Sequence, residues 1–360
     1  MRKKWTYRQS NKRDYKNIAE FRKNFQRLYI NCYEPKYYEW KIDRNPTHKA
    51  EFWIAEQKNR IVGIKSVIPK RIMNLGKIYV AGEIGDSYTI PEFRGCGIFT
   101  RLSKIAREKA IENGVDFVYN TPNNNSRPLY EQKLNHSEIS SLSIRSLSRP
   151  LNFKITFKER FNNVVFAYFI SSILDVFFNI FNINNKLAVN ERNKQKIAIS
   201  EVGSFPDDID DLWRSESKNY DIIIVRDKKY LEWRFVKSSD NYMLLIARSR
   251  EGEILGYIVG KICKDRNLLR GIIADFLVIK NNPKIFAILI TKIIEEFRKK
   301  DVDTMSTWVN KNSLYYNTLI RFGFIYHTKI PVLCYKNEYG KEIINGNYRW
   351  HFTLSDSDNI

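Results

Sequence analysis

Cysteine is scarce in this chain, and the motifs of metal sites and of several nucleotide sites are missing. The only cysteines among 360 residues are Cys32, Cys96, Cys263 and Cys334, far apart and without a CxxC pair. This spacing argues against a zinc site or a disulfide framework and suits a reducing cytoplasm. A P-loop is excluded because the sequence has no GxxxxGK[ST] run. We therefore expect a protein that binds no metal.

A secretory signal is also missing, because the basic residues at the N-terminus precede no apolar segment. The sequence has no RNA-recognition, zinc-finger or homeodomain pattern. Lys and Arg nevertheless exceed Asp and Glu by 61 to 40, which gives a net charge of +21. Such a charge attracts polyanions, whether coenzyme A, an anionic membrane, an acidic glycan or nucleic acid, without choosing among them. The expected location is the cytoplasm, with association at the inner face of the membrane left open.

What the chain does contain is enough apolar and aromatic material for folded cores. Hydrophobic residues make up 43% and aromatic residues 14% of the sequence, which excludes a disordered protein. A chain of 360 residues is long for a single core and comfortable for two domains.

A turn with two glycines, Arg94-Gly95-Cys96-Gly97, lies between a predicted strand and a predicted amphipathic helix. Pro91 ends the strand, and glycine lets the backbone turn while it exposes successive N–H groups. At the N-terminus of a helix such groups favour an anion such as a pyrophosphate. The turn lacks the third glycine of the dinucleotide-binding GxGxxG fingerprint. An ordinary strand-to-helix turn remains the alternative.

The elements around this turn follow a simple order. A helix is predicted over residues 15–33, then strands over residues 52–56 and 61–67, joined by a polar turn. A third strand over residues 78–86 completes an antiparallel meander. The glycine turn and its helix follow, and residues 115–120 return as another strand.

This order and the pattern of the turn resemble motif A of the GNAT superfamily of acyl-CoA N-acyltransferases. The motif is a strand, x-P-x-x-[RQ]-x-x-G-x-[GA] and a helix; Pro91, Arg94 and Gly97 match it, whereas Phe99 replaces a small residue. The resemblance implies that one backbone segment faces the pantetheine arm of the cofactor and that the turn caps its pyrophosphate. The implied residues are Ser87, Tyr88, Thr89 and Ile90 for the arm, and Arg94, Gly95, Cys96, Gly97, Ile98, Phe99 and Thr100 for the pyrophosphate.

Cys96 also has a second interpretation. A thiol at a helix N-terminus is activated as a nucleophile, so covalent catalysis is the alternative to a passive place in the loop. We favour the passive place, because the residue at this point of the motif varies within the family.

A second resemblance follows the strand over residues 115–120. Asn123, Ser126, Leu129 and Tyr130 fit the family's motif B, roughly N-x-x-A-x-x-[LF]-Y-E-K-L-G-F, although Asn135-His136 replaces the Gly-Phe pair. The resemblance implies that Asn123 holds splayed backbone near the cofactor and that Tyr130 is the general acid near the cofactor sulfur. An aromatic residue packed in the core is the alternative for Tyr130.

The acceptor amine needs a base, and two carboxylates lie on the predicted strand before the turn. Glu83 and Asp86 differ by three positions, so strand alternation predicts that they point to opposite faces and that only one reaches the substrate. We favour Glu83 as the catalytic base. Asp86 is expected to have a structural role, because it has a counterpart, Asp275, in a second copy of the pattern.

That second copy occupies the later half of the chain. Residues 230–234 echo residues 37–41, and residues 271–275 echo residues 82–86, as in a duplication with small deletions. Residues 279–284, which follow the matching strand, contain no glycine, so the second copy is expected to be degenerate and non-catalytic.

The predicted fold class is α/β (α+β), with two tandem GNAT-like domains of mixed, mostly antiparallel sheets flanked by helices. The predicted division is residues 1–150 for a GNAT domain with the acyl-CoA site, 151–196 for an apolar helix and polar linker, 197–340 for the degenerate copy and 341–360 for a tail.

Two segments lie outside the repeat. Residues 161–183 are apolar and long enough to cross a bilayer, but Asp175 and several asparagines interrupt them. Packing between the domains, association with an anionic membrane surface and a true span remain open. Near the C-terminus, Asp356 and Asp358 follow an aromatic run. A solvated tail is expected there, in preference to a cation site or acid-base groups.

The resemblance implies acetyl transfer from acetyl-CoA, or from another acyl-CoA, to an amino group by direct attack, without a covalent enzyme intermediate. Among tandem GNAT proteins the chain looks most like bacterial acyltransferases associated with surface-polysaccharide assembly, so the expected acceptor is a small-molecule or glycan amine, such as an amino sugar. Two alternatives stay open. One is a FemAB-type aminoacyl-tRNA-dependent transferase, in which tRNA would explain the basic charge. The other is a membrane-associated scaffold of the same fold without catalysis.

Overall fold

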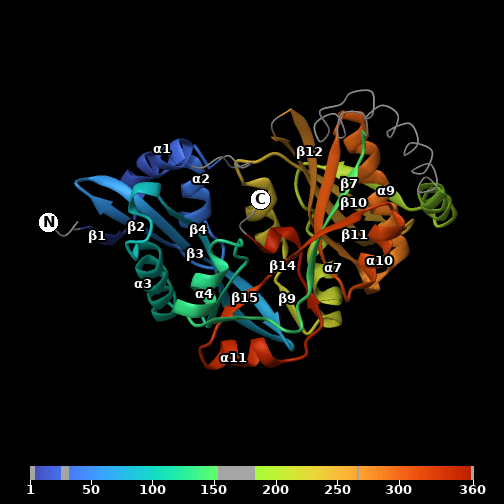
Figure 1. Cartoon of the computed structure of the whole chain (residues 1–360). Helices are drawn as coiled ribbons and strands as arrows, with labels where there is room; N and C mark the ends of the chain where they lie inside the picture. Colours follow the sequence, from blue (N-terminus) through green and yellow to red (C-terminus); the bar gives the residue numbers. More distant parts are fainter. Residues whose placement is uncertain (1–4, 26–31, 153–182, 266, 358–360) are drawn as a thin grey trace.

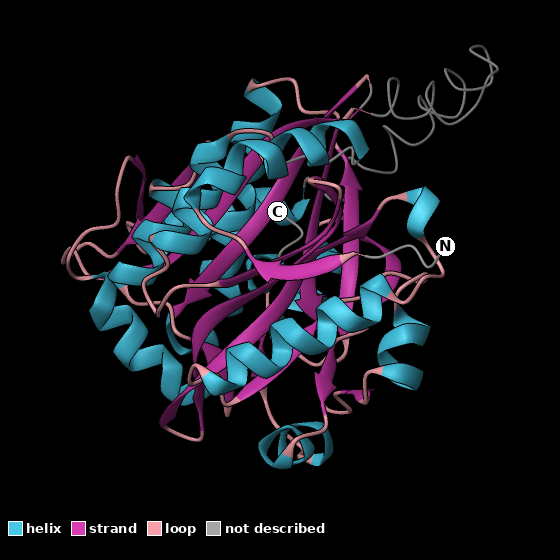
Figure 2. Ribbon diagram, turned by 90° about the vertical axis from the view of Figure 1, so that its left-hand side faces the viewer, coloured by secondary structure: helices cyan, strands magenta, loops and turns pink. Residues whose placement is uncertain are grey.

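Two β-sheets make up the core of the molecule, each flanked by helices. The computed structural model describes residues 5–25, 32–152, 183–265 and 267–357. Figure 1 shows the half drawn in blue and green beside the half drawn in orange, and Figure 2 shows helices outside the strands. The predicted α/β class with mixed, mostly antiparallel sheets flanked by helices is confirmed.

The first sheet is built mainly by the N-terminal half, in the order β1-β2-β3-β4-β5-β15-β6. Along this path the neighbouring strands are antiparallel except β4 and β5, which are parallel. The strands are β1 (Thr6–Gln9), β2 (Glu51–Gln57), β3 (Arg60–Asn74), β4 (Lys77–Thr89), β5 (Phe117–Asn120), β15 (Leu333–Tyr335) and β6 (His136–Glu138). The far end of β3 also pairs with β9 (Ile222–Ile224), which pairs with β16 (Trp350–His351).

The second sheet has the order β14-β7-β13-β12-β11-β10-β8. Here the parallel neighbours are β12 and β13. The strands are β14 (Ile325–Ile330), β7 (Ile144–Pro150), β13 (Thr304–Asn310), β12 (Leu268–Val278), β11 (Ile254–Asp265), β10 (Tyr242–Arg248) and β8 (Ala198–Val202).

One long helix packs against each sheet. In α3 (Ile98–Glu112) the buried residues include Ile98, Leu102, Ala106 and Ala110, which are spaced to form one helix face. In the second copy α9 (Pro283–Lys299) packs in the same way against β10, β11 and β12. Further helices in the described part of the chain include α1 (Tyr15–Phe25), α2 (Pro35–Tyr38), α4 (Arg127–Lys133), α7 (Ile209–Glu216), α8 (Lys228–Leu231), α10 (Leu314–Arg321) and α11 (Glu338–Asn345).

The strands predicted for the first half are confirmed, and the helix predicted over residues 15–33 is confirmed over Tyr15–Phe25 but is wrong at Cys32 and Tyr33, which form a turn. The strands predicted over residues 52–56, 61–67 and 78–86 lie in β2, β3 and β4, and the strand after the helix is β5. The helix predicted over residues 15–33 begins as α1, and its next residues, 26–31, lie outside the described part of the chain.

The two sheets repeat one pattern, as predicted. In each sheet a long hairpin, β3–β4 or β11–β12, leads through a helix to a parallel strand. Gly63 pairs with Thr89 in the first hairpin, and Gly256 pairs with Val278 in the second. Asp86 lies three residues before Thr89, and Asp275 lies three residues before Val278, so the two aspartates occupy matching positions.

Each sheet takes strands from the other half of the chain: the second sheet takes β7, and the first takes β15 as well as β9 and β16. β7 comes from the first half and lies between β13 and β14, whereas β15 comes from the second half and lies between β5 and β6. Each half therefore depends on the other to complete its sheet. The predicted domain boundaries remain a prediction.

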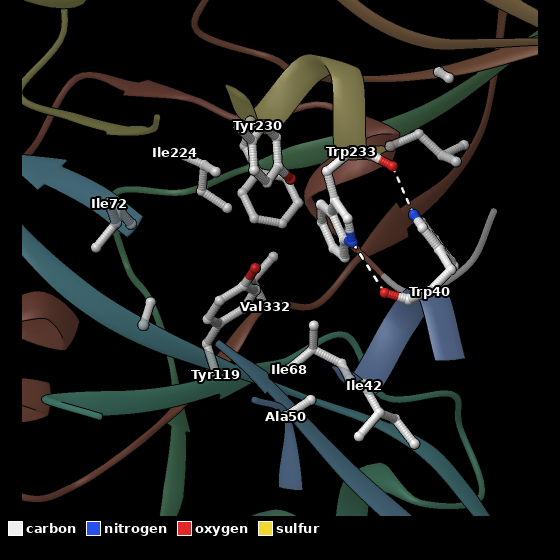
Figure 3. Close-up of a cluster of buried hydrophobic side chains, with 14 of the residues drawn as sticks. Trp40, Ile42, Ala50, Ile68, Ile72, Tyr119, Ile224, Tyr230, Trp233 and Val332 are labelled. Atoms are coloured by element: carbon white, nitrogen blue, oxygen red, sulfur yellow. Dashed lines mark hydrogen bonds between the residues drawn. The ribbon is translucent and has the colours of Figure 1, made fainter. Parts of the chain in front are cut away.

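Two matching tryptophans meet between the sheets (Figure 3). The rings of Trp40 and Trp233 stack with centroids 5.1 Å apart and an interplanar angle of 22°. Trp40 Nε1 donates a hydrogen bond to Trp233 O at 2.6 Å, and Trp233 Nε1 donates to Trp40 O at 3.0 Å. Each indole comes from a π-helical turn, Glu39–Asp43 or Glu232–Val236. The contact is therefore self-complementary, like one across a two-fold axis.

The C-terminal segment is buried, so the prediction of a solvated tail is wrong for residues 350–357. Asp356 forms an ion pair with Arg226 at 2.7 Å, and both side chains are fully buried. The carbonyl of Asp356 accepts hydrogen bonds from Lys70 Nζ at 3.1 Å and from the Tyr119 hydroxyl at 2.6 Å. These partners offset the desolvation of the carboxylate, and a search for local acidic runs cannot reveal them because they are distant in sequence.

The apolar segment over residues 161–183 lies outside the described part of the chain except for Ile183. Within the described ranges, none of the helices combines the length and the apolar character that a bilayer crossing requires.

The paired indoles give a first testable prediction. Trp40→Phe removes the donor to the Trp233 carbonyl, so we expect the free energy of unfolding to fall by about 1–3 kcal/mol. Trp40→Phe combined with Trp233→Phe should show a coupling energy of about 0.5–1.5 kcal/mol in chemical denaturation. Trp213→Phe, a half-buried indole away from this contact, is the control. Additive effects of the two central substitutions would contradict the reciprocal contact.

Candidate functional site

The parallel strands β4 and β5 separate along their length. They pair only at Ala81–Phe117, Gly82–Val118 and Glu83–Tyr119. Beyond this point β4 continues to Thr89 and pairs with β3 alone, while β5 ends at Asn120. The segment predicted to face a pantetheine arm, residues 87–90, therefore lies where β4 has left β5.

The glycine turn is open at the N-terminus of α3. Gly95 and Gly97 have φ values of 78° and 81°, which other residues adopt only with strain. Gly97 is the N-cap of α3, and no side chain caps the helix. The turn residues 94–97 are exposed, and a Cβ at Gly95 or Gly97 would meet no atom within 4 Å. The first N–H groups of the helix are therefore available to an anion.

The side chains near the turn leave it unblocked. Arg94 is exposed and donates hydrogen bonds to Thr89 O and to the Tyr88 hydroxyl, each at 3.3 Å. Ile98 is buried, whereas Phe99 and Thr100 are half-buried. Phe99 turns its ring inward, edge-on to the ring of Tyr130 with centroids 5.5 Å apart. The bulky residue in place of a small one thus faces the interior.

A buried lysine, which the sequence analysis missed, joins two predicted site residues. Lys65 Nζ donates hydrogen bonds to Ser87 Oγ at 2.7 Å and to the Tyr130 hydroxyl at 2.5 Å. It also lies 4.2 Å from the centroid of the Phe99 ring. β3, β4, α3 and α4 each supply one member of this cluster. Sequence reasoning missed Lys65 because a lysine in an alternating strand is usually solvent-exposed.

Burial sets the protonation behaviour of this cluster. It lowers the pKa of Lys65 well below its ordinary value, against the opposing effect of Asp86. It raises the pKa of Tyr130, although hydrogen bonds to Ser87 and Ser103 act in the other direction. Burial also lowers the pKa of His136, whose ring centroid lies 5.0 Å from that of Tyr130, to about 3. His136 is therefore neutral at physiological pH.

Asn123 acts on the backbone before α4. Its Oδ1 accepts hydrogen bonds from the backbone N–H groups of Asn125 and Ser126 at 3.1 Å and 3.0 Å. This holds the turn that precedes Tyr130. Contact between Asn123 and a cofactor stays a prediction.

Glu83 and Asp86 point to the same face of the sheet, so the prediction of opposite faces is wrong. Glu83 pairs with Lys70 at 2.6 Å, and Asp86 accepts a hydrogen bond from Ser66 Oγ at 2.6 Å. Lys70 and Ser66 lie four residues apart on β3, and alternation places them on one face. The reason is a β-bulge in β4. The pairing of β4 with β3 shifts there, opposite Ile64 and Ser66 of β3. Asp86 has a φ of 47° there, and the extra residue resets the alternation.

Asp86 is enclosed by positive charge. It forms ion pairs with Arg22 and, at 2.9 Å, with Lys41, and all three side chains are buried. Burial alone would raise the pKa of Asp86, but the two cations hold it well below its ordinary value. A carboxylate of this kind is a poor proton acceptor.

The two predicted catalytic residues lie on opposite sides of the first sheet. Glu83 faces the second half of the molecule, because its partner Lys70 also contacts the buried segment at Asp356. Tyr130 and Lys65 lie on the side covered by α3 and α4. The structure therefore does not bring Glu83 and Tyr130 together.

The second copy has no open helix N-terminus at the matching place. Asn282 is the N-cap of α9, and its side chain accepts a hydrogen bond from Lys284 N at 2.9 Å. Behind it, Phe276, Phe286 and Tyr315 pack together with centroids 4.6–5.1 Å apart. The first turn of α9 is therefore capped by its own side chain, whereas the first turn of α3 is not. Within the described ranges, no cluster of His, Cys, Asp and Glu suits a metal ion.

The enclosed Asp86 gives a second prediction. Asp86→Asn removes the anion that pairs with the buried Arg22 and Lys41, so the free energy of unfolding at neutral pH should fall by about 3–5 kcal/mol. Because the folded-state pKa is depressed, the stabilisation is present above the unfolded-state pKa of about 4 and is lost as pH falls below it. The difference between wild type and variant, measured by denaturation, should therefore shrink below pH of about 4.

Asp211→Asn is the matched control, because Asp211 forms an exposed ion pair with Arg214. It should change the stability by less than about 1 kcal/mol. A loss for Asp86→Asn that stays constant down to pH of about 2 would contradict the assignment.

Comparison with known proteins finds a family model for part of the chain and similar solved structures. Residues 7–133 match the family model described as an acetyltransferase (GNAT) domain. No curated protein sequence matches the chain significantly. Similar solved structures include a probable N-acyltransferase from Enterococcus faecalis V583, N-myristoyltransferase from Saccharomyces cerevisiae with bound myristoyl-CoA, and a tandem GNAT protein from the clavulanic acid biosynthesis pathway.

The three structures share the fold at low sequence identity. The Enterococcus protein is 14% identical with a TM-score of 0.57, over 92% of this chain and 72% of its own. The yeast enzyme is 12% identical with a TM-score of 0.62, over 97% and 84%. The clavulanic acid pathway protein is 10% identical with a TM-score of 0.60, over 92% and 98%. The chain therefore has the fold of a tandem GNAT protein, and its residues 7–133 match the model of an acetyltransferase (GNAT) domain.

Proposed function

We propose that this protein is an acyl-CoA-dependent N-acyltransferase that transfers an acetyl group from acetyl-CoA to an amino group. The observation that carries the proposal is the open glycine turn at the N-terminus of α3, beside the point where β4 leaves β5. Free amides and the helix dipole would hold the pyrophosphate. Arg94, which is exposed beside the turn, would add a positive charge.

The proposed chemistry follows from the thioester. An acyl-CoA is already activated, so the protein has to place an amine against the thioester carbon, accept its proton and protonate the leaving sulfur. The edge of β4 over residues 87–90 would bind the pantetheine arm, with Tyr130 as the general acid. Glu83 would take the amine proton from the opposite face of the sheet, through the opening between β4 and β5. Its pairing with Lys70 means that the acceptor would have to displace or share that lysine.

The acceptor we propose is a small-molecule or glycan amine, such as an amino sugar of a surface polysaccharide. This part rests on the resemblance to polysaccharide-associated tandem proteins alone. The intact turn favours an acyl-CoA over an aminoacyl-tRNA, because a tRNA-dependent enzyme has little need for a pyrophosphate-binding turn. The closed α9 N-terminus supports a single cofactor site in the first copy.

Ligand-induced stabilisation tests the cofactor assignment. With acetyl-CoA at about a hundredfold excess over its dissociation constant, the protein should gain about 2.7 kcal/mol and melt several degrees higher. A series of longer acyl-CoA chains would define the acyl group. A non-catalytic scaffold, or a transferase that takes its acyl group from tRNA, predicts no shift.

Gly97→Val places a side chain where the phosphate should bind, so this variant should lose the acetyl-CoA shift. Gly252→Val is the matched control, because Gly252 also has a positive φ of 91° and open space around it, but it lies in the second copy. For each variant, the melting temperature with acetyl-CoA is compared with its own melting temperature without ligand. The destabilisation that valine causes at a positive φ is present in both measurements and therefore does not affect the shift. An equal acetyl-CoA shift in both variants would rule out the turn as the binding site.

A further inference from the structure

Lys65 is an ionisable side chain in a place where the fold does not need one. It is 1% exposed, and it forms no ion pair with any carboxylate of the described chain. Its polar contacts are the hydroxyl groups of Ser87 and Tyr130. Burying an ammonium group without an anion is unfavourable. Such a residue in a natural protein calls for a functional explanation.

The second copy is an internal control for this argument. The register that aligns Gly63 with Gly256 also aligns Lys65 with Ile258 and Ser87 with Phe276. Ile258 and Phe276 are fully buried and pack in the apolar core of that half. The same strands therefore fold with apolar residues at both positions, in the copy whose helix N-terminus is closed.

The hydrogen-bond directions show how Lys65 acts on Tyr130. Lys65 Nζ is the donor in this contact, so the Tyr130 oxygen accepts the hydrogen bond. The hydroxyl hydrogen of Tyr130 must then point to another acceptor. A charge-assisted hydrogen bond onto the oxygen also favours the phenolate over the phenol.

We propose that Lys65 is a positioning residue that prepares Tyr130 to protonate the sulfur leaving group in the acyl transfer. The inference rests on the proposed function, because it assigns a task within the same site. The amine nitrogen forms a bond to the thioester carbon, and the carbon–sulfur bond breaks with its electron pair on sulfur. Tyr130 gives its proton to that sulfur, and Lys65 stabilises the phenolate that results. The proton that the amine releases then reaches Tyr130 through solvent and restores its hydroxyl group.

Phe99 completes this arrangement. Its ring lies 4.2 Å from Lys65 Nζ, and the ring of Tyr130 lies 4.8 Å from it. The faces of aromatic rings attract cations without neutralising them. A carboxylate in the place of Phe99 would accept hydrogen bonds from Lys65 Nζ in competition with the Tyr130 oxygen. The departure of Phe99 from the small residue of the motif is thus explained by its contact with Lys65.

Lys65→Met tests the inference by steady-state kinetics and melting temperature. We expect kcat to fall by about 10- to 100-fold, at or below the lower end of the range for proton-transfer catalysis, because Tyr130 itself remains, while KM for acetyl-CoA stays within about twofold. The melting temperature should stay the same or rise, because the variant removes a buried charge. A loss of kcat that tracks a loss of stability would overturn the proposal.

Lys261→Met is the matched control. Lys261 is also a buried strand lysine, but it pairs with Asp240 at 2.8 Å in the second copy. Its replacement should lower the melting temperature, because it removes the cation that pairs with a buried carboxylate. The kcat of the remaining folded protein should be unchanged.

Tyr130→Phe decides whether Lys65 acts through the tyrosine. Adding Lys65→Met to Tyr130→Phe should lower kcat no further, because the group that Lys65 prepares is already missing. Multiplicative effects would assign Lys65 another task and overturn the inference, as would full activity of Lys65→Met. If the wild type binds no acyl-CoA and transfers no acyl group, the proposed function fails, and the role of Lys65 fails with it.

Discussion

The reciprocal contact of Trp40 with Trp233 is the interaction on which the arrangement of the two copies depends. Each indole N–H is satisfied by the carbonyl of the other tryptophan, so neither polar group is left unpaired in the interior. The contact forms only when both copies are in register. It brings the face of the first sheet that carries Glu83 and Asp86 toward the second copy. The buried C-terminal segment then inserts between them, with Asp356 bound to Arg226 and Lys70.

Charge compensation distinguishes structural from functional groups in this interior. Asp86 is matched by Arg22 and Lys41, and Asp275 is matched by Arg226 in the second copy. These groups share one task, which is to neutralise each other where water is excluded. Lys65 breaks the pattern, because its neighbours are hydroxyl groups and rings. Lys65 pairs with no carboxylate of the described chain, and it lies beside Tyr130, for which we predict a role as general acid.

Local patterns in the sequence were sufficient for the strands of the first half, the glycine turn and the repeated segment around each central tryptophan. Each of these depends on residues within a few positions of one another. The bulge at Asp86 was missed because an aspartate in left-handed conformation carries no signal comparable to glycine. Arg226 lies far from both Asp275 and Asp356 in sequence, so no local pattern could reveal the buried tail. Lys65 was missed for a related reason, since its burial depends on α4 covering the strand.

The exchanged strands set the order in which the molecule can be completed during synthesis. β5 and β6 leave the ribosome well before β15, the strand that lies between them. At the usual rate of translation the wait is roughly 10–40 s. During that time the first sheet has a vacancy with unpaired backbone groups on both sides, which is a site for mispairing with other chains. A nascent chain released before β15 would therefore contain the glycine turn, Lys65 and Tyr130 on an unfinished sheet.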